Sequence, residues 1–264
     1  MVTALSALTR LEVLRIGFES PRSHPDRKVR RLPPRTRTVL PVLTQLWFNG
    51  ASEYLEDLVA RIDVPRLDKL KITFFHQLIF DCPQLTQFVS RTPAFKAHNE
   101  ARVEFSCWDV MVTLPQKLGG FLKLGSSCKQ SDRQLSYLAQ VCNSPLTRAL
   151  VPTVEHLHIR SGYWRPDWQD DIESGQWLDL FRPFAATKEL YISSEFTPRI
   201  APALKELIGD GVIEVLPALQ TLFLEEPLPS RRVQEAIEQF VAARQLAGHP
   251  IGISHWNERR VVKD

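Results

Sequence analysis

Hydrophobic positions return along this chain in one recurring phrase. An aliphatic residue is followed by proline, and further apolar residues stand at matching offsets, ending on an anchoring leucine and a second apolar position. The phrase occurs as LPVLTQLWF (40–48), VPRLDKLKI (64–72), VPTVEHLHI (151–159) and LPALQTLFL (216–224). LTRLEVLRI (8–16) and FAATKELYI (184–192) fit the same frame without the proline, so the chain contains a repeat.

The end of each phrase predicts a strand with one buried face. Its last three residues alternate apolar, variable, apolar, which is the period of a half-buried strand. Proline suits the approach to a strand rather than its middle, because it cannot donate to a ladder. Two weaker copies, residues 101–106 and 120–126, complete the series. The anchoring residues of the eight expected strands are Leu14, Leu46, Leu70, Val103, Leu122, Leu157, Leu190 and Leu222.

Amphipathic helices are expected between most of these strands. Ser52 and Ser131 are candidate N-caps, and Gly248 stands in the usual stop position of the last helix. Asp81 and Pro83 open another helix. Strand–helix alternation implies parallel neighbouring strands joined by crossovers, and therefore the α/β class. The expected helices span residues 53–62, 81–92, 131–142, 200–209 and 231–248.

The spacing of the repeats is irregular near residues 106–120. Val103 and Leu122 are only 19 residues apart (103 to 122), whereas most gaps leave room for a strand, a helix and two loops. WDVMVTL (108–114) has the pattern of an extra strand rather than a helix. We therefore expect one continuous unit, residues 1–264, with an interruption at this point.

Two segments do not fit the repeat. Residues 20–38 hold seven Arg or Lys and four prolines, which is typical of a basic, Pro-rich surface loop. The run RKVRR (27–31) within this segment has three interpretations: a nuclear import signal, a contact for phosphates, or part of a solvated loop. The solvated loop is the favoured interpretation. Residues 161–176 form an acidic, aromatic insertion. Together with Trp177, which follows it, this insertion either forms a partner-binding flap or packs on the rim of the array. The residues concerned are Trp164, Trp168, Trp177, Asp167, Asp170 and Asp171.

Composition places the chain among folded proteins without an obvious charged partner. The apolar share is 44%, the charged share 24% and the net charge +3, so neither nucleic acid nor an anionic membrane is expected as partner. No apolar run approaches the roughly 20 residues of a membrane-spanning helix. The N-terminus lacks the features of a secretion signal. The prediction is an intracellular protein of the cytoplasm or nucleus.

Motifs for chemistry are missing from the sequence. Cys82, Cys107, Cys128 and Cys142 form no CxxC pair, so they read as reduced thiols, some of them core filler, rather than disulfides or zinc ligands. His156 and His158 have a spacing that suits a metal, but a polar surface strand is the favoured interpretation. There is no GxSxG, P-loop, GxGxxG or HExxH motif. We expect no enzyme, no cofactor and no metal.

The amino-acid sequences of the repeats resemble those of a known family. The LxxLxxLxI frame resembles leucine-rich repeats, and longer stretches resemble the repeat region of F-box proteins that are numerous in mushroom-forming (basidiomycete) fungi. These stretches are FESPRSHPDRKVRRLPPRTRTVLPVLTQLWFNGASEYLEDLVARID (18–63), FFHQLIFDCPQLTQFVSRTP (74–93), SDRQLSYLAQVCNS (131–144), DWQDDIESGQWLDLFRPF (167–184) and LYISSEFTPRIAPALKELIGDGVIEVLPALQTLFLEE (190–226).

The resemblance implies an irregular leucine-rich-repeat-like solenoid, with a mostly parallel sheet on the concave side and helices on the convex side. It also implies the substrate-recognition part of a ubiquitin-ligase adaptor. This chain contains no F-box, so a Skp-type adaptor is a partner only if an F-box is supplied. Leucine-rich repeats are expected to have asparagine or cysteine three residues beyond the last apolar position of each repeat. In this chain other residues stand there: Glu19, Ala51, Phe75, Gly162, Glu195 and Pro227. The alternatives are a free-standing binding module or decoy, or a degenerate gene product without a selected partner.

In such an array the residue between the two apolar strand positions points to the concave side, where repeat proteins commonly bind partners. Aromatic side chains there are typical of protein interfaces. The alternative is that these residues are ordinary filler or are covered by the insertion. The candidate partner-binding residues are Arg15, Trp47, Lys71, Glu104, Lys123, His158, Tyr191 and Phe223.

Overall fold

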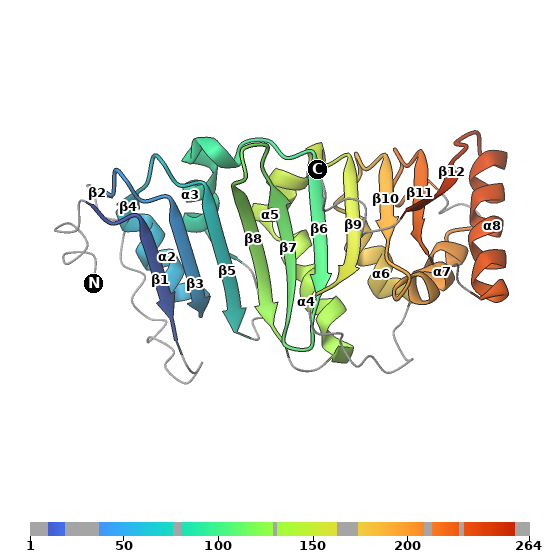
Figure 1. Ribbon diagram of the computed structural model, residues 1–264, viewed down its shortest axis with the longest axis horizontal. Helices are drawn as coiled ribbons and strands as arrows, with labels where there is room; N and C mark the ends of the chain where they lie inside the picture. The colour runs from blue at the N-terminus through green and yellow to red at the C-terminus, as the bar shows by residue number, and fades with distance from the viewer. Residues whose placement is uncertain are drawn as a thin grey trace.

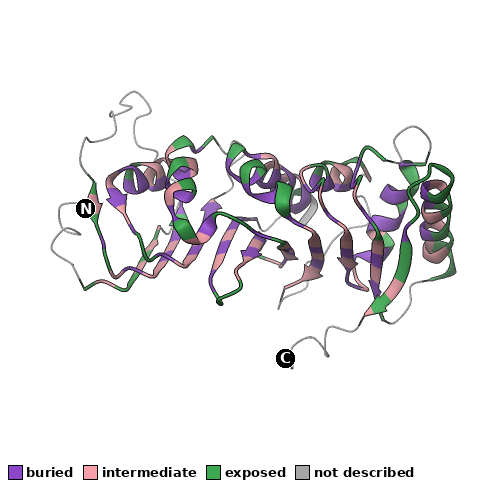
Figure 2. Cartoon of the chain, turned by 90° about the horizontal axis from the view of Figure 1, so that it is seen from above, coloured by how far each residue is buried: buried purple, intermediate pink, exposed green. Residues whose placement is uncertain are grey.

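A single large sheet with helices on one side makes up the protein (Figure 1). The computed structural model describes residues 10–18, 37–75, 81–128, 131–162, 174–208, 213–226 and 230–256. Viewed from above, the helices gather on one side of the sheet (Figure 2). The predicted α/β class with a mostly parallel sheet is confirmed.

Ten strands form the sheet, and they do not follow one another in chain order. All neighbouring strands that the structure describes are parallel, except that β7 is antiparallel to both β6 and β8. In spatial order the strands are β1 (Val13–Gly17), β3 (Gln45–Gly50), β5 (Lys69–Phe75), β8 (Phe121–Ser127), β7 (Asp109–Pro115), β6 (Glu100–Phe105), β9 (His156–Ser161), β10 (Glu189–Ile192), β11 (Thr221–Glu225) and β12 (Gly252–Trp256). A separate short pair joins β2 (Thr38–Val39) to β4 (Ile62–Asp63).

The three strands β6, β7 and β8 form a meander that runs backwards through the sheet. The chain leaves β5, passes over two strand positions to β6, and returns through β7 to β8, which pairs with β5. It then continues to β9, which pairs with β6 on the other side. The predicted interruption near residues 106–120 and the extra strand at 108–114 are therefore confirmed.

Helices lie in the connections between the other strands, except that most of the connection from β1 to β3 lies outside the described residues. Five of the helices lie where the amphipathic pattern predicts, with ends shifted by a few residues. The helices are α2 (Ser52–Arg61), α3 (Pro83–Arg91), α4 (Ser131–Asn143), α5 (Pro145–Leu150), α6 (Ser174–Phe181), α7 (Thr197–Glu206) and α8 (Arg231–Leu246), with 3-10 turns η1 (Pro93–Phe95) and η2 (Val151–Thr153). Helices α5 and α6 and strand β12 were not predicted. None of the described helices is both long and apolar enough to cross a membrane.

A turn precedes the strand in each of the four copies of the recurring phrase that contain proline. The proline occupies the second position of this turn, where its preset φ is suitable and its missing N–H is not needed. The N–H of the fourth residue donates to the carbonyl of the first: Leu43 to Leu40 (3.4 Å), Leu67 to Val64 (3.2 Å), Val154 to Val151 (3.0 Å) and Leu219 to Leu216 (3.1 Å). The predicted position of proline at the approach to a strand is confirmed.

The core lies between the sheet and the helices. Of the eight predicted strand anchors, seven are buried, and Leu14 on the edge strand β1 is partly buried. Cys82, Cys128 and Cys142 are buried thiols in this core, so the prediction of core cysteines is confirmed. Burial raises the pKa of the Cys82 and Cys142 thiols, which keeps them protonated.

Side chains from neighbouring elements satisfy helix ends and loop carbonyls. The N-terminus of α3 is capped by Glu56 of α2, which accepts hydrogen bonds from the N–H groups of Gln84 (2.9 Å) and Leu85 (2.7 Å). Gln134 donates to the carbonyls of Ser106 and Cys128. The predicted cap at Ser52 is wrong, because α2 already begins at Ser52 and its side chain bonds Glu53 instead.

Candidate functional site

One face of the sheet is covered by helices, and no helix that the structure describes lies on the other, which we call the open face. Register decides which side chains line up on the open face. Residues at matching positions of neighbouring strands form a central row that crosses the whole sheet. In spatial order this central row is Arg15, Trp47, Lys71, Lys123, Thr113, Arg102, His158, Tyr191, Phe223 and Ser254.

Seven of the eight predicted partner-binding residues belong to this central row. Glu104 does not, because β6 pairs with β9 so that Arg102 lies opposite His158. Glu104 is on the same face but two residues further along the strand, opposite Arg160. Glu104 was chosen because Val103 was taken as the anchor of this strand. In the structure Ala101 is the residue that pairs with the anchor Leu157 of β9, so Arg102 takes the place in the central row that was predicted for Glu104.

Trp47 on β3 is flanked by cations from both neighbouring strands. The guanidinium carbon of Arg15 lies 4.1 Å from the centre of the indole ring, and the ammonium of Lys71 lies 5.9 Å from it. Both distances fit cation–π contacts, which position a long basic side chain against a rigid ring.

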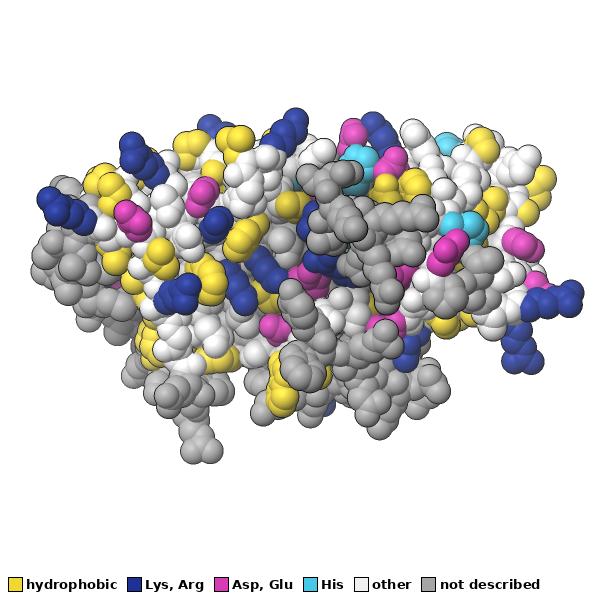
Figure 3. All heavy atoms as spheres, viewed as in Figure 1, with side chains coloured by type: hydrophobic (Ala, Val, Ile, Leu, Met, Phe, Trp, Pro, Cys, Tyr) yellow, Lys and Arg dark blue, Asp and Glu magenta, His cyan; other side chains and the backbone are white. Residues whose placement is uncertain are grey.

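The open-face residues of β1, β3, β5 and β8 are called the basic half here. Alternation along these strands places four basic side chains on the open face and no acidic one. In Figure 3, dark blue and yellow side chains mix over this part of the molecule, with magenta ones among them. The four basic residues are Arg15, Lys69, Lys71 and Lys123.

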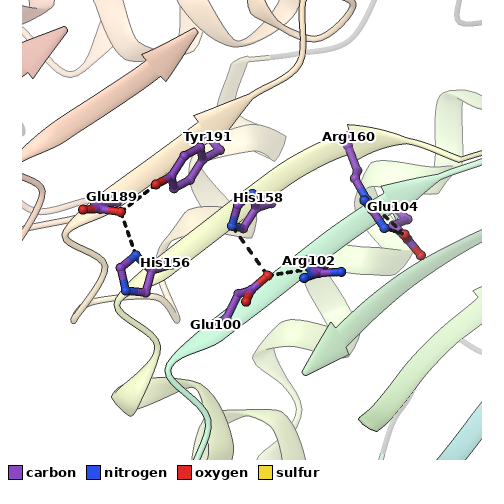
Figure 4. A network of polar contacts seen from close by, with 8 residues as sticks. All are labelled: Glu100, Arg102, Glu104, His156, His158, Arg160, Glu189 and Tyr191. Atoms are coloured by element: carbon purple, nitrogen blue, oxygen red, sulfur yellow. Dashed lines mark hydrogen bonds and ion pairs between the residues drawn. The ribbon is translucent and has the colours of Figure 1, made fainter. Parts of the chain in front are cut away.

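The open-face residues of β6, β9, β10 and β11 are called the paired half, because their charges are matched within the protein (Figure 4). Glu104 accepts from Lys123 Nζ at 2.6 Å and from Arg160 Nε at 3.0 Å. Burial alone would raise the pKa of Glu104, but the two cations outweigh it and lower the pKa. Glu104 therefore joins β6 to β8 and β9 as a carboxylate.

His158 lies at the centre of the paired half. Its Nε2 is 3.6 Å from Glu100 Oε1, and the same oxygen accepts from Arg102 Nε at 2.5 Å. Burial lowers the pKa of His158 from 6.5 to about 4, with further lowering by Arg102 and Arg160, although Glu100 opposes the change. The imidazole is therefore neutral at pH 7.

Three rings stack across β9, β10 and β11. His158 and Tyr191 are 4.2 Å apart with planes at 9°, and Tyr191 and Phe223 are 4.3 Å apart with planes at 5°. Trp256 of β12 packs edge-on against Tyr191 at 5.7 Å and 86°. We call these four residues the aromatic stack; its rings are in the range where aromatic pairs stabilise each other.

Glu189 fixes the polar end of the aromatic stack (Figure 4). It accepts from Tyr191 Oη at 2.7 Å and contacts His156 Nδ1 at 2.7 Å. Burial alone would raise the pKa of Glu189, but these hydrogen bonds outweigh it and lower the pKa. Burial and the neighbouring Glu189 carboxylate raise the pKa of Tyr191, so the phenol stays protonated.

The two histidines that suggested a metal each face a different carboxylate, Glu189 for His156 and Glu100 for His158. Among the described residues, no group of three or more His, Cys, Asp or Glu side chains is placed to hold a metal ion. Arg160, on the same strand as the two histidines, pairs with Glu104.

Trp177 is not part of a surface flap or rim. It lies on α6, completely buried, and packs against Phe105, Phe181 and Phe196 in the core. The insertion is shorter than predicted, because β9 extends to Ser161 and α6 begins at Ser174. The other insertion residues and the RKVRR run lie outside the described residues: Trp164, Trp168, Asp167, Asp170, Asp171 and 27–31.

Several residues of the open face were missed by the sequence reasoning. Glu100 and Glu189 are the first alternating positions of β6 and β10. The histidines that face them, His158 and His156, lie on β9, so these contacts depend on the strand order. Trp256 was missed because β12 has only Ile253 as an apolar anchor in its middle.

A polar groove of about 690 Å³ also lies on the helix side, between α4 and α6, and it is lined by polar residues that bond one another, such as Asn143, Arg148, Asp179 and Arg182. The open face differs from it, because it presents aromatic side chains together with Arg15, Lys69 and Lys71, which have no partner carboxylate among the described residues. Such a surface can bind by stacking, hydrophobic contact and ion pairing. No protein-family model, curated protein or solved structure matches this chain.

Proposed function

We propose that the chain is a protein-interaction module that binds a partner protein on the open face of its sheet. The observation that carries this proposal is the central row, in which Trp47, Tyr191 and Phe223 are half-buried and lie in register with basic side chains. Interfaces are enriched in Trp, Tyr and Arg, and such residues often supply most of the binding energy.

We also propose that the array is a leucine-rich-repeat-like solenoid and that it serves as the recognition part of an F-box-type adaptor. The recurring proline turn, strand and helix support the first part of this proposal. The family resemblance of the repeat sequences supports the second. The backward meander β6–β8 is a departure from a regular repeat array, in which each strand pairs with the next one along the chain.

A free-standing binding module is the second candidate. The same central row supports it, and an F-box reading frame directly upstream of the coding sequence would separate the two. A degenerate product without a partner does not need an aromatic row in register, so the central row favours a binding role.

The test is affinity capture from a lysate of a mushroom-forming fungus, read by mass spectrometry. The wild-type chain is compared with a Trp47→Ala/Tyr191→Ala/Phe223→Ala variant. A matched control, Leu118→Ala/Leu246→Ala, removes apolar side chains that are 99% and 90% exposed and lie outside the open face.

Proteins captured by the wild type and the control but lost with the triple variant support the proposal. Adaptor or cullin subunits among them support the ligase role. Identical captures by all three chains would contradict binding at the open face. Circular dichroism of the triple variant, with an unchanged spectrum expected, separates lost binding from lost folding.

A further inference from the structure

We infer that the basic half binds an extended acidic segment of a partner protein, with carboxylates placed on Arg15 and Lys71. This inference rests on the proposed function and specifies the chemistry of the partner. It depends on the charges of the basic half, on the contacts of Trp47 and on the contrast with the rest of the open face.

The basic half holds positive charge that the described residues do not neutralise. Among the described residues, Arg15, Lys69 and Lys71 form no ion pair, and only Lys123 reaches a carboxylate, Glu104 on β6. No acidic residue alternates onto the open face of β1, β3, β5 or β8. A partner of opposite charge is therefore electrostatically complementary to this part of the sheet.

Trp47 positions Arg15 for a carboxylate. The guanidinium lies 4.1 Å from the centre of the indole ring, and a stacked guanidinium keeps its N–H donors free at the edge. These donors match the two oxygens of a carboxylate, and the stacked side chain loses less conformational entropy on binding than a free one. Lys71 provides a second cation on the other side of the same ring.

The spacing of the two cations suits an extended peptide that crosses the strands. Arg15 on β1 and Lys71 on β5 are separated by β3, so their strands are about 10 Å apart. An extended chain covers that distance in about three residues. Acidic residues two to four positions apart can therefore reach both cations.

A nucleic acid is the less suitable partner for this surface. Proteins that bind single strands offer open ring faces on which bases stack, whereas Arg15 and Lys71 both approach the ring of Trp47. In the paired half, Arg102 and Arg160 are already paired with Glu100 and Glu104, so a phosphate backbone that continued across the sheet would meet matched charges there.

The experiment measures fluorescence anisotropy of a labelled peptide in which aspartate alternates with serine. The probe control is the same peptide with asparagine in place of aspartate, and the second probe is a labelled single-stranded oligothymidylate. The wild-type chain is compared with Arg15→Gln/Lys71→Gln. The matched control is Lys205→Gln/Arg232→Gln, which removes the same charge from exposed positions on α7 and α8.

We expect the aspartate peptide to bind the wild type and the control at least tenfold more tightly than the Arg15→Gln/Lys71→Gln variant, and the affinity to fall with salt. Equal binding to all three proteins, or equal binding of the asparagine peptide, would overturn the inference. Tighter binding of the oligothymidylate than of the peptide would also overturn it, in favour of a nucleic-acid site.

The two proposals fail in different ways. If lysate proteins are captured through Trp47, Tyr191 and Phe223 but the acidic peptide does not bind, the protein-binding function stands and the acidic partner is wrong. If the peptide binds at Arg15 and Lys71 but capture is unaffected by the triple variant, the general proposal for the open face fails.

Discussion

The basic half and the paired half of the open face differ in how their charges are used. In the paired half, Glu100, Glu104 and Glu189 each have a cation, an imidazole or a phenol as partner. In the basic half, Arg15 and Lys71 lie against the ring of Trp47 and form no ion pair with any residue that the structure describes. The comparison suggests that one half holds the strands together while the other remains available to a partner.

The largest expected effect is at the border between the two halves, where β8 pairs with β7. A Cβ on Gly125 would overlap the carbonyl oxygen of Val110 and Sδ of Met111. Gly125→Ala should therefore lower the free energy of unfolding by about 3 kcal/mol, measured by urea denaturation. Gly17→Ala on β1, whose Cβ would meet nothing within 4 Å, is the control and should change it by less than about 0.5 kcal/mol. Equal effects at both positions would contradict this close packing.

The second expected effect is in the paired half itself. Glu104→Gln leaves Lys123 and Arg160 without their carboxylate at a position where the Glu104 side chain is only 18% exposed. The free energy of unfolding should fall by about 2 kcal/mol at pH 7. Glu238→Gln, at an exposed position on α8, should have little effect.

The Glu104 effect has a defined pH dependence. Because its folded pKa is lowered, the stabilisation is present above the pKa of the unfolded state and is lost as pH falls through the folded pKa. The difference between wild type and Glu104→Gln should therefore shrink below about pH 4. A difference that stays constant into acid would show that the pair does not act through its charge.

The third expected effect concerns His158. Its folded pKa of about 4 lies below the ordinary 6.5, so the unfolded chain takes up the proton first and stability falls as pH decreases from 6.5 to 4. The slope is at most about 1.4 kcal/mol per pH unit. His158→Phe keeps a ring beside Tyr191 but cannot titrate, so its unfolding free energy should change less over this range. His249→Phe, at an exposed position, should keep the wild-type slope.

The smallest expected effect on stability is in the basic half. Arg15→Gln/Lys71→Gln removes two cation–π contacts at the surface, so the free energy of unfolding should fall by no more than about 1 kcal/mol. Thermal unfolding followed by circular dichroism measures this. A loss as large as that of Glu104→Gln would remove the contrast between the two halves.

Alternation and the proline phrase predicted nine of the ten strands of the large sheet, but not which strands are neighbours. The period of two tells which face of a strand is buried, and the turn tells where the strand begins. Neither contains information about which strand lies beside it, so the backward course of β6, β7 and β8 was not predicted. Strand β12 was also missed, because GISHW (252–256) offers little apolar alternation.

The candidate site was predictable as a row but not as a set of contacts. Trp47, Tyr191 and Phe223 follow from their position between two apolar residues. The pairing of Glu104 with Lys123 and Arg160 requires the sheet order, because these residues come from three different strands. Trp177 lies in the core because α6 begins before it, at Ser174. This start of α6 was not predicted, because residues 161–176 were assigned to an insertion from their acidic and aromatic composition.

The meander also has a consequence during synthesis on the ribosome. In a regular array each new strand pairs with the one that was completed just before it. Here β5 ends at Phe75, but its neighbour β8 begins only at Phe121, after β6 and β7. The outer edge of β5 therefore stays open while these residues emerge, and open strand edges favour aggregation. We expect the nascent chain to depend on chaperones most strongly in this interval, before β8 is complete.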